Sequence, residues 1–411
     1  MTCRVVLIAL MLAWAPAFAD APPDTVTLEA VLDLAREASP RLALERQGVA
    51  MAKAERVKAG AFPNPTVTVG QQHQGGRPTQ FDGRWAQGVS VELPLLLGGQ
   101  RGARVKAADQ GIEAAKAQVV ASGNALAADA GAAYVALLLA QEKRSALTTS
   151  FAELGHMREI VAGRQVSGMA SQYDLLRMDV ELEAWRTRTA EAAADLADRQ
   201  GELATLLGFQ GWRPLGMGDL RPLNVNPEVK PVDGNPSIIA ARRDEDAAQA
   251  GVEVARRERF PNVSVFAGRS ATMDPFGAVD AVGISVEIPI FDTRRGALDR
   301  AHADAQSAGL RLRLVEAGVQ SDVERYSFQV VQLTAALEQF RQRMGTRLPA
   351  LKQMAEDAYR LGKSTIVELL DAARTRYETQ VGQLELIAGI MEAQLRLQAA
   401  RGELAPATGS N

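Results

Sequence analysis

Residues that could do catalytic or metal chemistry are few in this chain, and they are scattered. The three histidines, His73, His156 and His302, stand far apart, and no group of His, Cys, Asp and Glu has the spacing of a metal site. The run GGQRG at 98–102 resembles a phosphate-binding loop, but it lacks the Lys and the Ser or Thr that would follow. No nucleophile stands in a pattern with a base. We therefore expect no enzymatic activity, no cofactor and no metal site.

Two short segments that combine a glycine, a hydroxyl and a carboxylate are better candidates for function. They are 168–174 (GMASQYD) and 362–368 (GKSTIVE). A glycine can end a helix in the left-handed conformation. A Ser or Thr followed three residues later by Asp or Glu can form a capping box that begins the next helix. The sequence therefore predicts two sharp turns between helices.

The first nineteen residues have the composition of a secretory signal peptide. Arg4 precedes an apolar stretch at 5–13, and residues 17–19 (AFA) form a small-residue cleavage site. The single cysteine, Cys3, lies inside this segment, so the predicted mature chain has no thiol for a disulfide, a nucleophile or a metal site. The 46 basic and 49 acidic residues give a net charge of -3, which is too balanced to mark the whole chain as a binder of nucleic acid or of anionic lipid.

The chain is predicted to be duplicated, because four landmarks recur in the same order after 194–198 residues. The landmarks are Ser39-Pro40 and Asn235-Pro236, FPN at 62–64 and 260–262, SVELP at 90–94 and SVEIP at 285–289, and Gly168 and Gly362. We expect a first repeat at 20–207, a connector rich in Gly, Pro and Asn at 208–235, a second repeat at 236–404 and a flexible tail at 405–411.

Each repeat is predicted to hold a helix, a β-hairpin and a long pair of antiparallel helices. The helices are expected at 27–60 and 236–259, the hairpins at 64–93 and 262–290, and the turns of the long pairs near 163–172 and 358–366. No proline interrupts residues 95–213. A helix from residue 99 to 165 would be about 100 Å long, which is too long for a globular core.

The predicted strands have the length and alternation of strands that cross an outer membrane. Val89, Val91 and Leu93 alternate with small or polar residues, and strands of about 9 to 11 residues span a bilayer when tilted. The longest clean apolar run after the signal, 130–140, is too short for a spanning helix. Four strands cannot close a barrel, and an open sheet edge is not tolerated in lipid. Three chains that contribute twelve strands are the simplest solution, and two soluble hairpins on a coiled-coil scaffold are the alternative.

The duplicated plan, the FPN entry to each hairpin and the VELP and VEIP exits resemble the TolC family of outer-membrane efflux proteins across nearly the whole mature chain. The runs at 92–104 (ELPLLLGGQRGAR) and 288–296 (IPIFDTRRG) resemble its CzcC-like heavy-metal branch. The resemblance implies a mainly α-helical homotrimer, with a twelve-stranded β-barrel joined to a long periplasmic tunnel of coiled-coil helices. It also implies an outer-membrane exit channel that works with a periplasmic adaptor and a proton-driven inner-membrane pump of the resistance-nodulation-division type. Drug efflux and type I secretion by the same fold remain alternatives.

The same resemblance implies roles for residues near the two turns. Asp371 matches an acidic ring that narrows the channel entrance, and Asp174 and Tyr359 match positions of a gating network; the other interpretation of Asp174 is a helix cap. Ser364 stands where the network has an arginine, so we expect a different gate that uses Lys363 or Arg360. The expected adaptor-docking residues are Gly168, Ser171, Gly362, Lys363 and Thr365, and the expected lumen residues are Glu92 and Glu287.

Overall fold

The structure is a computed structural model, and it describes residues 23–37, 39–73, 85–229, 231–272 and 277–405. The described chain divides into two compact units. The turn unit contains residues up to 39, 133–220 and 350–384, and the sheet unit contains 40–132, 221–349 and the residues from 385 on. The predicted signal peptide and most of the predicted tail lie outside the described residues.

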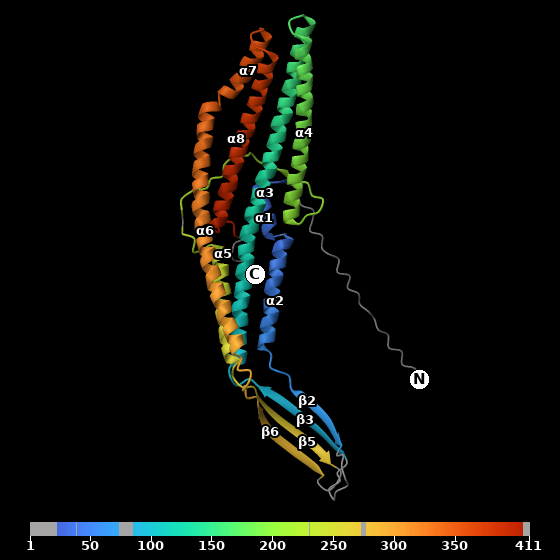
Figure 1. Ribbon diagram of the computed structural model, residues 1–411, viewed down its shortest axis with the longest axis vertical. Helices are drawn as coiled ribbons and strands as arrows, with labels where there is room; N and C mark the ends of the chain where they lie inside the picture. Colours follow the sequence, from blue (N-terminus) through green and yellow to red (C-terminus); the bar gives the residue numbers. More distant parts are fainter. Residues whose placement is uncertain (1–22, 38, 74–84, 230, 273–276, 406–411) are drawn as a thin grey trace, which may run out of the picture. The chain divides into compact units, whose positions relative to one another are not determined.

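The sheet unit contains a four-stranded antiparallel sheet in the order β2-β3-β5-β6 (Figure 1). Its strands are β2 (Thr66–His73), β3 (Trp85–Leu95), β5 (Val263–Thr272) and β6 (Ala278–Val286). The two predicted hairpins are thus confirmed, and β3 and β5 join them side by side. Strands β2 and β6 are left as the two edges of the sheet.

The register of the strands separates the sheet into an apolar face and a small-residue face. The apolar face carries Val67, Val69, Val89, Val91, Leu93, Val263, Val265, Val282, Ile284 and Val286. The small-residue face carries Thr68, Gly70, Gly88, Ser90, Gly268, Ser270, Gly283 and Ser285. Val282 is 84% exposed and Ile284 is 69% exposed in the single chain. The sequence alternation therefore predicted the two faces correctly.

Strand β6 ends at Val286, although the sequence predicted a strand up to Ile290. In this register Val263 pairs with Val286, so the residue opposite Ile288 would be Pro261. The Glu287 N–H still donates to the Asn262 carbonyl, so the next N–H directed at this strand would be that of residue 289. Pro289 has no N–H to donate, which ends the pairing at this point. Ile288 and Ile290 keep the apolar alternation of the strand and are 71% and 70% exposed.

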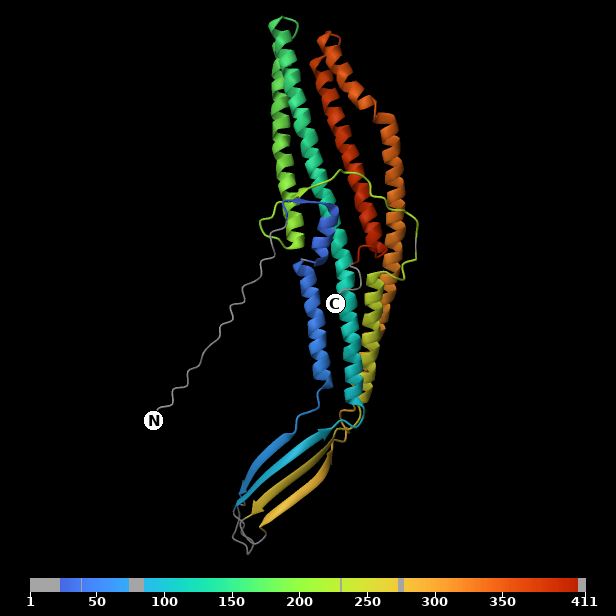
Figure 2. The same ribbon diagram turned by 180° about the vertical axis from the view of Figure 1, so that it is seen from behind.

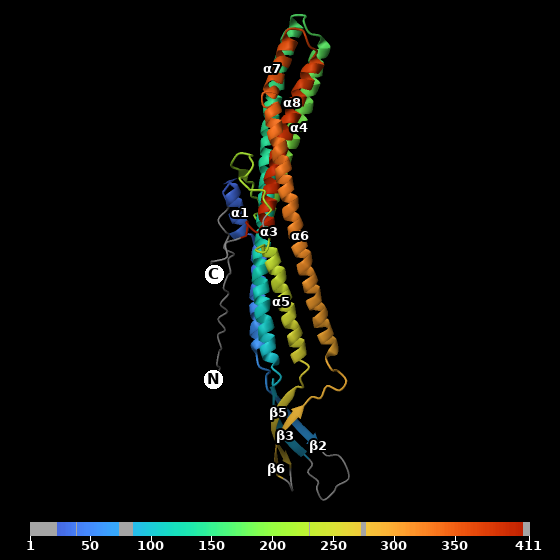
Figure 3. The same cartoon turned by 90° about the vertical axis from the view of Figure 1, so that its left-hand side faces the viewer.

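Four helices of the sheet unit run from the sheet in the same order as the strands. They are α2 (Pro40–Gly60), α3 (Gln100–Val166), α5 (Pro236–Arg257) and α6 (Arg295–Met344). Helix α3 lies between α2 on one side and α5 and α6 on the other (Figures 2 and 3). The last part of α8 (Ile366–Ala400) completes this unit.

Two prolines break helices that the sequence predicted to be continuous. The predicted helix at 27–60 is divided into α1 (Leu28–Glu37) and α2, which begins at Pro40. Pro is favoured at a first helical position because the N–H it lacks would have no partner there. Helix α6 ends at Met344, and α7 (Arg347–Arg360) follows after a two-residue break at Gly345. Pro349 cannot donate to the Gly345 carbonyl, and its ring clashes with that carbonyl, which explains the break.

In both halves of the chain, a residue with positive φ stands directly before the helix that follows the sheet. Gly99, directly before α3, has φ +75°, and Arg294, directly before α6, has φ +53°. An added Cβ on Gly98 would lie 2.5 Å from the Cβ of Phe260. The glycines of the GGQRG run thus allow a left-handed turn and a close contact, which explains them as a bend rather than as a phosphate loop.

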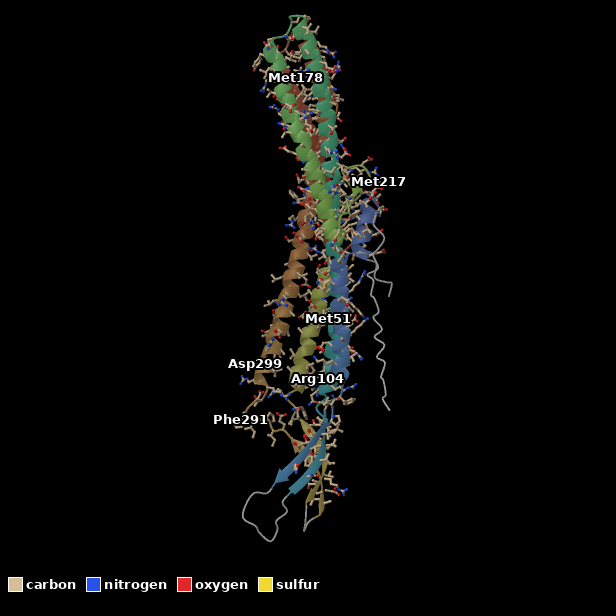
Figure 4. The ribbon with its side chains drawn as sticks, turned by 90° about the vertical axis from the view of Figure 1, so that its right-hand side faces the viewer. Met51, Arg104, Met178, Met217, Phe291 and Asp299 are labelled. Atoms are coloured by element: carbon tan, nitrogen blue, oxygen red, sulfur yellow. The ribbon has the colours of Figure 1, made fainter. Side chains whose placement is uncertain are left out.

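The turn unit is built from α1, the second half of α3, α4 (Gln172–Leu207), the end of α7 and the start of α8. One apolar cluster joins α3, α4, α7 and α8. It includes Leu154, Val161, Met178, Trp185, Tyr359, Ile366, Leu369 and Leu370. Figure 4 shows Met178 on α4 near the turns. A short parallel pairing of β1 (Thr25–Val26) with β4 (Leu215–Gly216) closes the other end of the unit.

Helix α3 contains a stretch that is long and apolar enough to cross a membrane by length and composition. The longest uninterrupted apolar run after the signal, 130–140, is shorter than this stretch, so run length alone did not predict it. In the structure 67% of the stretch is buried. Alanine accounts for much of its apolar character, and Ala127, Ala128 and Ala130 are almost fully buried. Close packing of helices therefore explains the composition.

Candidate functional site

The two predicted turns between helices have the same backbone structure. Gly168 ends α3 with φ +72°, and Gly362 ends α7 with φ +71°. The N–H of Met169 donates to the Arg164 carbonyl over 2.8 Å, and the N–H of Gly168 donates to the Gln165 carbonyl over 3.0 Å. The second turn repeats this pattern from Lys363 and Gly362. This is a Schellman motif, in which the left-handed glycine satisfies the last carbonyls of the helix.

Each turn continues into a capping box. The Asp174 N–H donates to Ser171 Oγ over 3.2 Å, and the Ser171 N–H donates to Asp174 Oδ2 over 3.0 Å. In the second turn the Thr365 N–H donates to Glu368 Oε2 over 2.7 Å, and the Glu368 N–H donates to Thr365 Oγ1 over 3.3 Å. Asp174 therefore caps α4, which is the other interpretation that the sequence left open. The capping contact leaves its negative charge in place.

Tyr359 and Arg164 bring the two turns into contact. The Arg164 guanidinium lies 4.8 Å from the centre of the Tyr359 ring, and Nη2 donates to the Met169 carbonyl over 3.1 Å. Tyr359 is 4% exposed. Burial and then the charge of Asp174 raise the pKa of the Tyr359 hydroxyl, against an opposite effect of Arg164. Tyr359 Oη, Arg164 Nε and Nη1, and Ser364 Oγ are buried without a hydrogen-bond partner among the described residues.

The remaining predicted residues of the turns lie at the surface. Asp371 is exposed on the first turns of α8, and its charge contributes to a raised pKa of Arg374 after larger effects of Glu181. Gly168, Ser171, Gly362, Lys363 and Thr365 are also exposed. Exposed apolar side chains of the first turn and of α4 lie beside them, namely Met169, Tyr173, Leu176 and Val180.

A buried ion pair joins the two helical hairpins of the turn unit. Arg374 on α8 donates to both carboxylate oxygens of Glu181 on α4, over 2.8 and 3.0 Å, and Trp185 Nε1 donates to the same carboxylate over 3.0 Å. The Glu181 side chain is 6% exposed. Burial alone would raise its pKa, but the hydrogen bonds and the charge of Arg374 outweigh burial and lower it below the ordinary value.

Further ion pairs support the same contact between hairpins. Glu153 on α3 accepts from Arg376 on α8 and from Lys352 on α7, the latter over 2.8 Å. None of these residues was predicted from the sequence, because charged residues at helical spacing normally indicate an exposed face. The usable signal was Glu181 four residues before Trp185, on the face that also holds Met178.

The two predicted lumen residues lie in the sheet unit. Glu92 belongs to the small-residue face, in a row with Thr66 and Phe266. Glu287 follows the end of β6, and its carboxylate accepts from Asn262 Nδ2 over 2.6 Å. Among the described residues no group of three or more His, Cys, Asp and Glu could hold a metal ion.

The sequence profile of the outer membrane efflux proteins matches residues 31–209 and 232–403, which together make up most of the chain. The chain belongs to this family. The two matched segments correspond closely to the two halves found by internal comparison. As a member of the outer membrane efflux protein family, it is an outer-membrane protein, and the resemblance found in the sequence is confirmed.

Relatives of this efflux protein have resistance functions. It is 26% identical to the cobalt-zinc-cadmium resistance protein CzcC of Cupriavidus metallidurans over 391 residues, which cover 90% of this chain and 89% of CzcC. It is 27% identical to the nickel-cobalt-cadmium resistance protein NccC of Alcaligenes xylosoxydans xylosoxydans, over 76% of this chain and 71% of NccC.

Solved structures of channel and outer-membrane proteins have the same fold. A structure of CusC, studied for folding and transmembrane channel formation, superposes with a TM-score of 0.75 at 19% identity and covers 94% of this chain and 95% of CusC. The outer membrane protein VceC of Vibrio cholerae superposes with a TM-score of 0.74 at 18% identity, over 91% of this chain and 96% of VceC. The mainly helical fold with one small antiparallel sheet is therefore that of this family.

Proposed function

We propose that this protein is the outer-membrane exit channel of a tripartite efflux system that exports heavy-metal cations. The observation that carries the cargo assignment is the match to CzcC over nearly the full length of both chains. A periplasmic adaptor and a proton-driven inner-membrane pump would complete the system. The chain itself then needs no metal site, because the pump selects the ion.

The sheet supports assembly of the pore from three copies. Edge strands β2 and β6 have unpaired backbone groups, which lipid does not tolerate. Twelve strands from three chains close a barrel with the apolar face towards lipid and the small-residue face towards the lumen. Glu92 then lies in the lumen, and Glu287 lies at its helical end.

We assign the entrance of the channel to the turn unit. Three copies of the exposed Asp371 around a narrow axis would favour cations. Tyr359, Asp174 and Arg164 would hold the entrance, with Arg164 in place of the arginine that the family network has at the position of Ser364. The exposed turn residues Gly168, Ser171, Gly362, Lys363 and Thr365 would dock the adaptor.

Conductance of the purified protein in planar bilayers tests these assignments. A cation-selective current from a heat-sensitive trimer is expected, and a chain that stays monomeric and never inserts would refute the pore. Asp371→Ala should raise conductance or reduce cation preference, whereas the matched control Glu183→Ala, on an exposed part of α4, should do neither. Unchanged conductance and selectivity in Asp371→Ala would remove the role of Asp371 alone.

The cargo is tested separately in cells. A metal-sensitive host that carries the matching adaptor and pump should regain resistance to cobalt, zinc or cadmium when this chain is supplied. Resistance to drugs without resistance to metals would overturn the cargo assignment and leave the channel assignment intact.

A further inference from the structure

The junction between sheet and helices exposes large apolar side chains. They come from four chain segments and form an apolar rim, namely Phe62, Leu97, Phe260, Ile288, Ile290 and Phe291. Phe291 is 100% exposed. Figure 4 shows Phe291 projecting from the sheet unit near the helix ends, on the same side as Asp299. A group of exposed apolar residues of this size marks an interaction surface.

The apolar rim continues the apolar face of the sheet. Ile288 and Ile290 follow Val282, Ile284 and Val286 at alternate positions, so the stripe extends past the last paired residue. The stretch from Ile288 on has no paired strand among the described residues, because Pro289 cannot continue the ladder. The rim thus lies between the sheet and the helix ends.

The helix ends next to the rim are basic. The seven residues of α2, α3, α5 and α6 closest to the sheet together hold nine basic and three acidic residues, although the whole chain has a net charge of -3. We call the nine basic residues the basic collar. The seven helical residues flanking each side of the two turns hold three basic and five acidic ones. The sheet end is therefore the more basic of the two, although Asp109 and Glu258, just outside the counted residues, pair with Arg56 and Arg104 at 3.0 Å.

Rim and collar are in contact. The Arg101 guanidinium lies 4.6 Å from the centre of the Phe62 ring, and its Nε donates to the Gly60 carbonyl over 2.7 Å. In the collar Arg295 and Arg300 have side chains that are 84% and 85% exposed. Their acidic partners lie 3.7 and 3.8 Å away, so these pairs are loose and easily exchanged for another anion.

We propose that the basic collar binds the phosphates of anionic phospholipids in the leaflet that faces the helices, with the apolar rim inserted at the boundary between acyl chains and head groups. The order from the sheet to the helices, first apolar side chains, then exposed aromatic rings, then basic residues, is the order that a membrane surface requires. A second copy of the chain is a poorer occupant, because it would bring a collar of like charge. The proposal rests on the membrane-spanning role of the sheet.

Spin labels at single cysteines test the position of the rim, because the predicted mature chain has no cysteine. In vesicles that contain phosphatidylglycerol, a label at Val282→Cys should collide with oxygen, a label at Phe291→Cys should lie at head-group depth, and a label at Phe328→Cys should collide with a water-soluble nickel chelate. Phe328 is a matched control, since it is also an exposed Phe. If the Phe291 label is in water while the Val282 label is in lipid, the position of the rim is refuted but the proposed pore is not. Aqueous labels at both positions would refute the proposed pore.

Lipid retention tests the collar. The purified protein in mixed micelles should retain phosphatidylglycerol in preference to phosphatidylcholine, and Lys106→Gln with Arg295→Gln and Arg300→Gln should reduce that preference at least about tenfold. The control set Arg341→Gln, Arg343→Gln and Arg347→Gln removes the same charge from exposed positions far along the chain and should change nothing. An equal loss of phosphatidylglycerol preference in both sets of variants would refute lipid binding by the collar. Equal retention of the two lipids by the native protein would refute it as well. Strong dipolar coupling between Phe291 labels would instead indicate contact between copies.

Discussion

Removal of Arg374 is predicted to loosen the contact between the two hairpins of the turn unit. In Arg374→Met the Glu181 carboxylate keeps the Trp185 hydrogen bond but loses two others while it stays 6% exposed. Breaking a fully buried pair costs about 3 to 5 kcal/mol. The Arg374 side chain is 39% exposed, so solvent screening reduces the estimate to about 2 to 3 kcal/mol. This corresponds to roughly 30- to 150-fold faster opening.

Hydrogen exchange of the assembled protein measures this opening directly at the amides of α4 and α8 near the pair. The matched control is Arg186→Met, which breaks a pair whose two side chains are each 72% exposed and should change exchange by less than about threefold. The double variant Glu181→Leu with Arg374→Met removes both charges and should recover most of the protection. Exchange in Arg374→Met within about threefold of the native rate would refute the reasoning.

The pH dependence of hydrogen exchange in the same variant tests the ion pair independently. In the native protein the pKa of Glu181 is lowered, so the stabilisation is complete above the ordinary value of 4.5 and is lost as the pH falls through the folded pKa. Without Arg374, burial raises the pKa of this carboxyl, so protonation stabilises the folded form. The difference in protection between native protein and variant should therefore shrink as the pH is lowered from 7 to 5.

Three other substitutions test local structure. Gly362→Ala places a Cβ on a left-handed residue and should destabilise the second turn by about 1 kcal/mol, seen as faster exchange there, whereas Gly163→Ala inside α3 should slow exchange. Tyr359→Phe removes a hydroxyl that has no hydrogen-bond partner in the described part of the chain and should leave exchange at the turns unchanged or slower, and a tenfold acceleration would contradict this. Gly98→Ala would bring a Cβ to 2.5 Å from Phe260 and should lower the thermal midpoint by the equivalent of about 1 to 3 kcal/mol, whereas Gly102→Ala, with open space around it, should not.

The sequence predicted those features that depend on neighbours along the chain. Alternation gave the two faces of the sheet, and the segments 168–174 and 362–368 gave both turns with their capping boxes. Contacts between distant segments were not predictable. The pairing of Glu181 with Arg374 depends on two hairpins that meet 193 residues apart in the chain.

The points where a strand or helix ends were predictable in principle. They required attention to where a proline removes a backbone N–H or clashes with an earlier carbonyl. The end of β6 follows from Pro289, which lies within the strand that was predicted up to Ile290 and has no N–H for the next ladder bond. The break after α6 follows from Pro349, which acts four residues before its own position.

The even number of strands has a consequence for symmetry. Because the sheet begins and ends with strands of opposite direction, β6 of one copy can meet β2 of the next in antiparallel pairing. Each hairpin alone also begins and ends with strands of opposite direction. Six copies of a chain of half the length could therefore form the same twelve-stranded barrel. The proposed trimer thus has approximate sixfold symmetry, with one hairpin as the repeating unit. The positions where the halves differ, such as Gly99 against Arg294 and the unbroken α3 against the divided α6 and α7, are the places where sixfold symmetry has been lost.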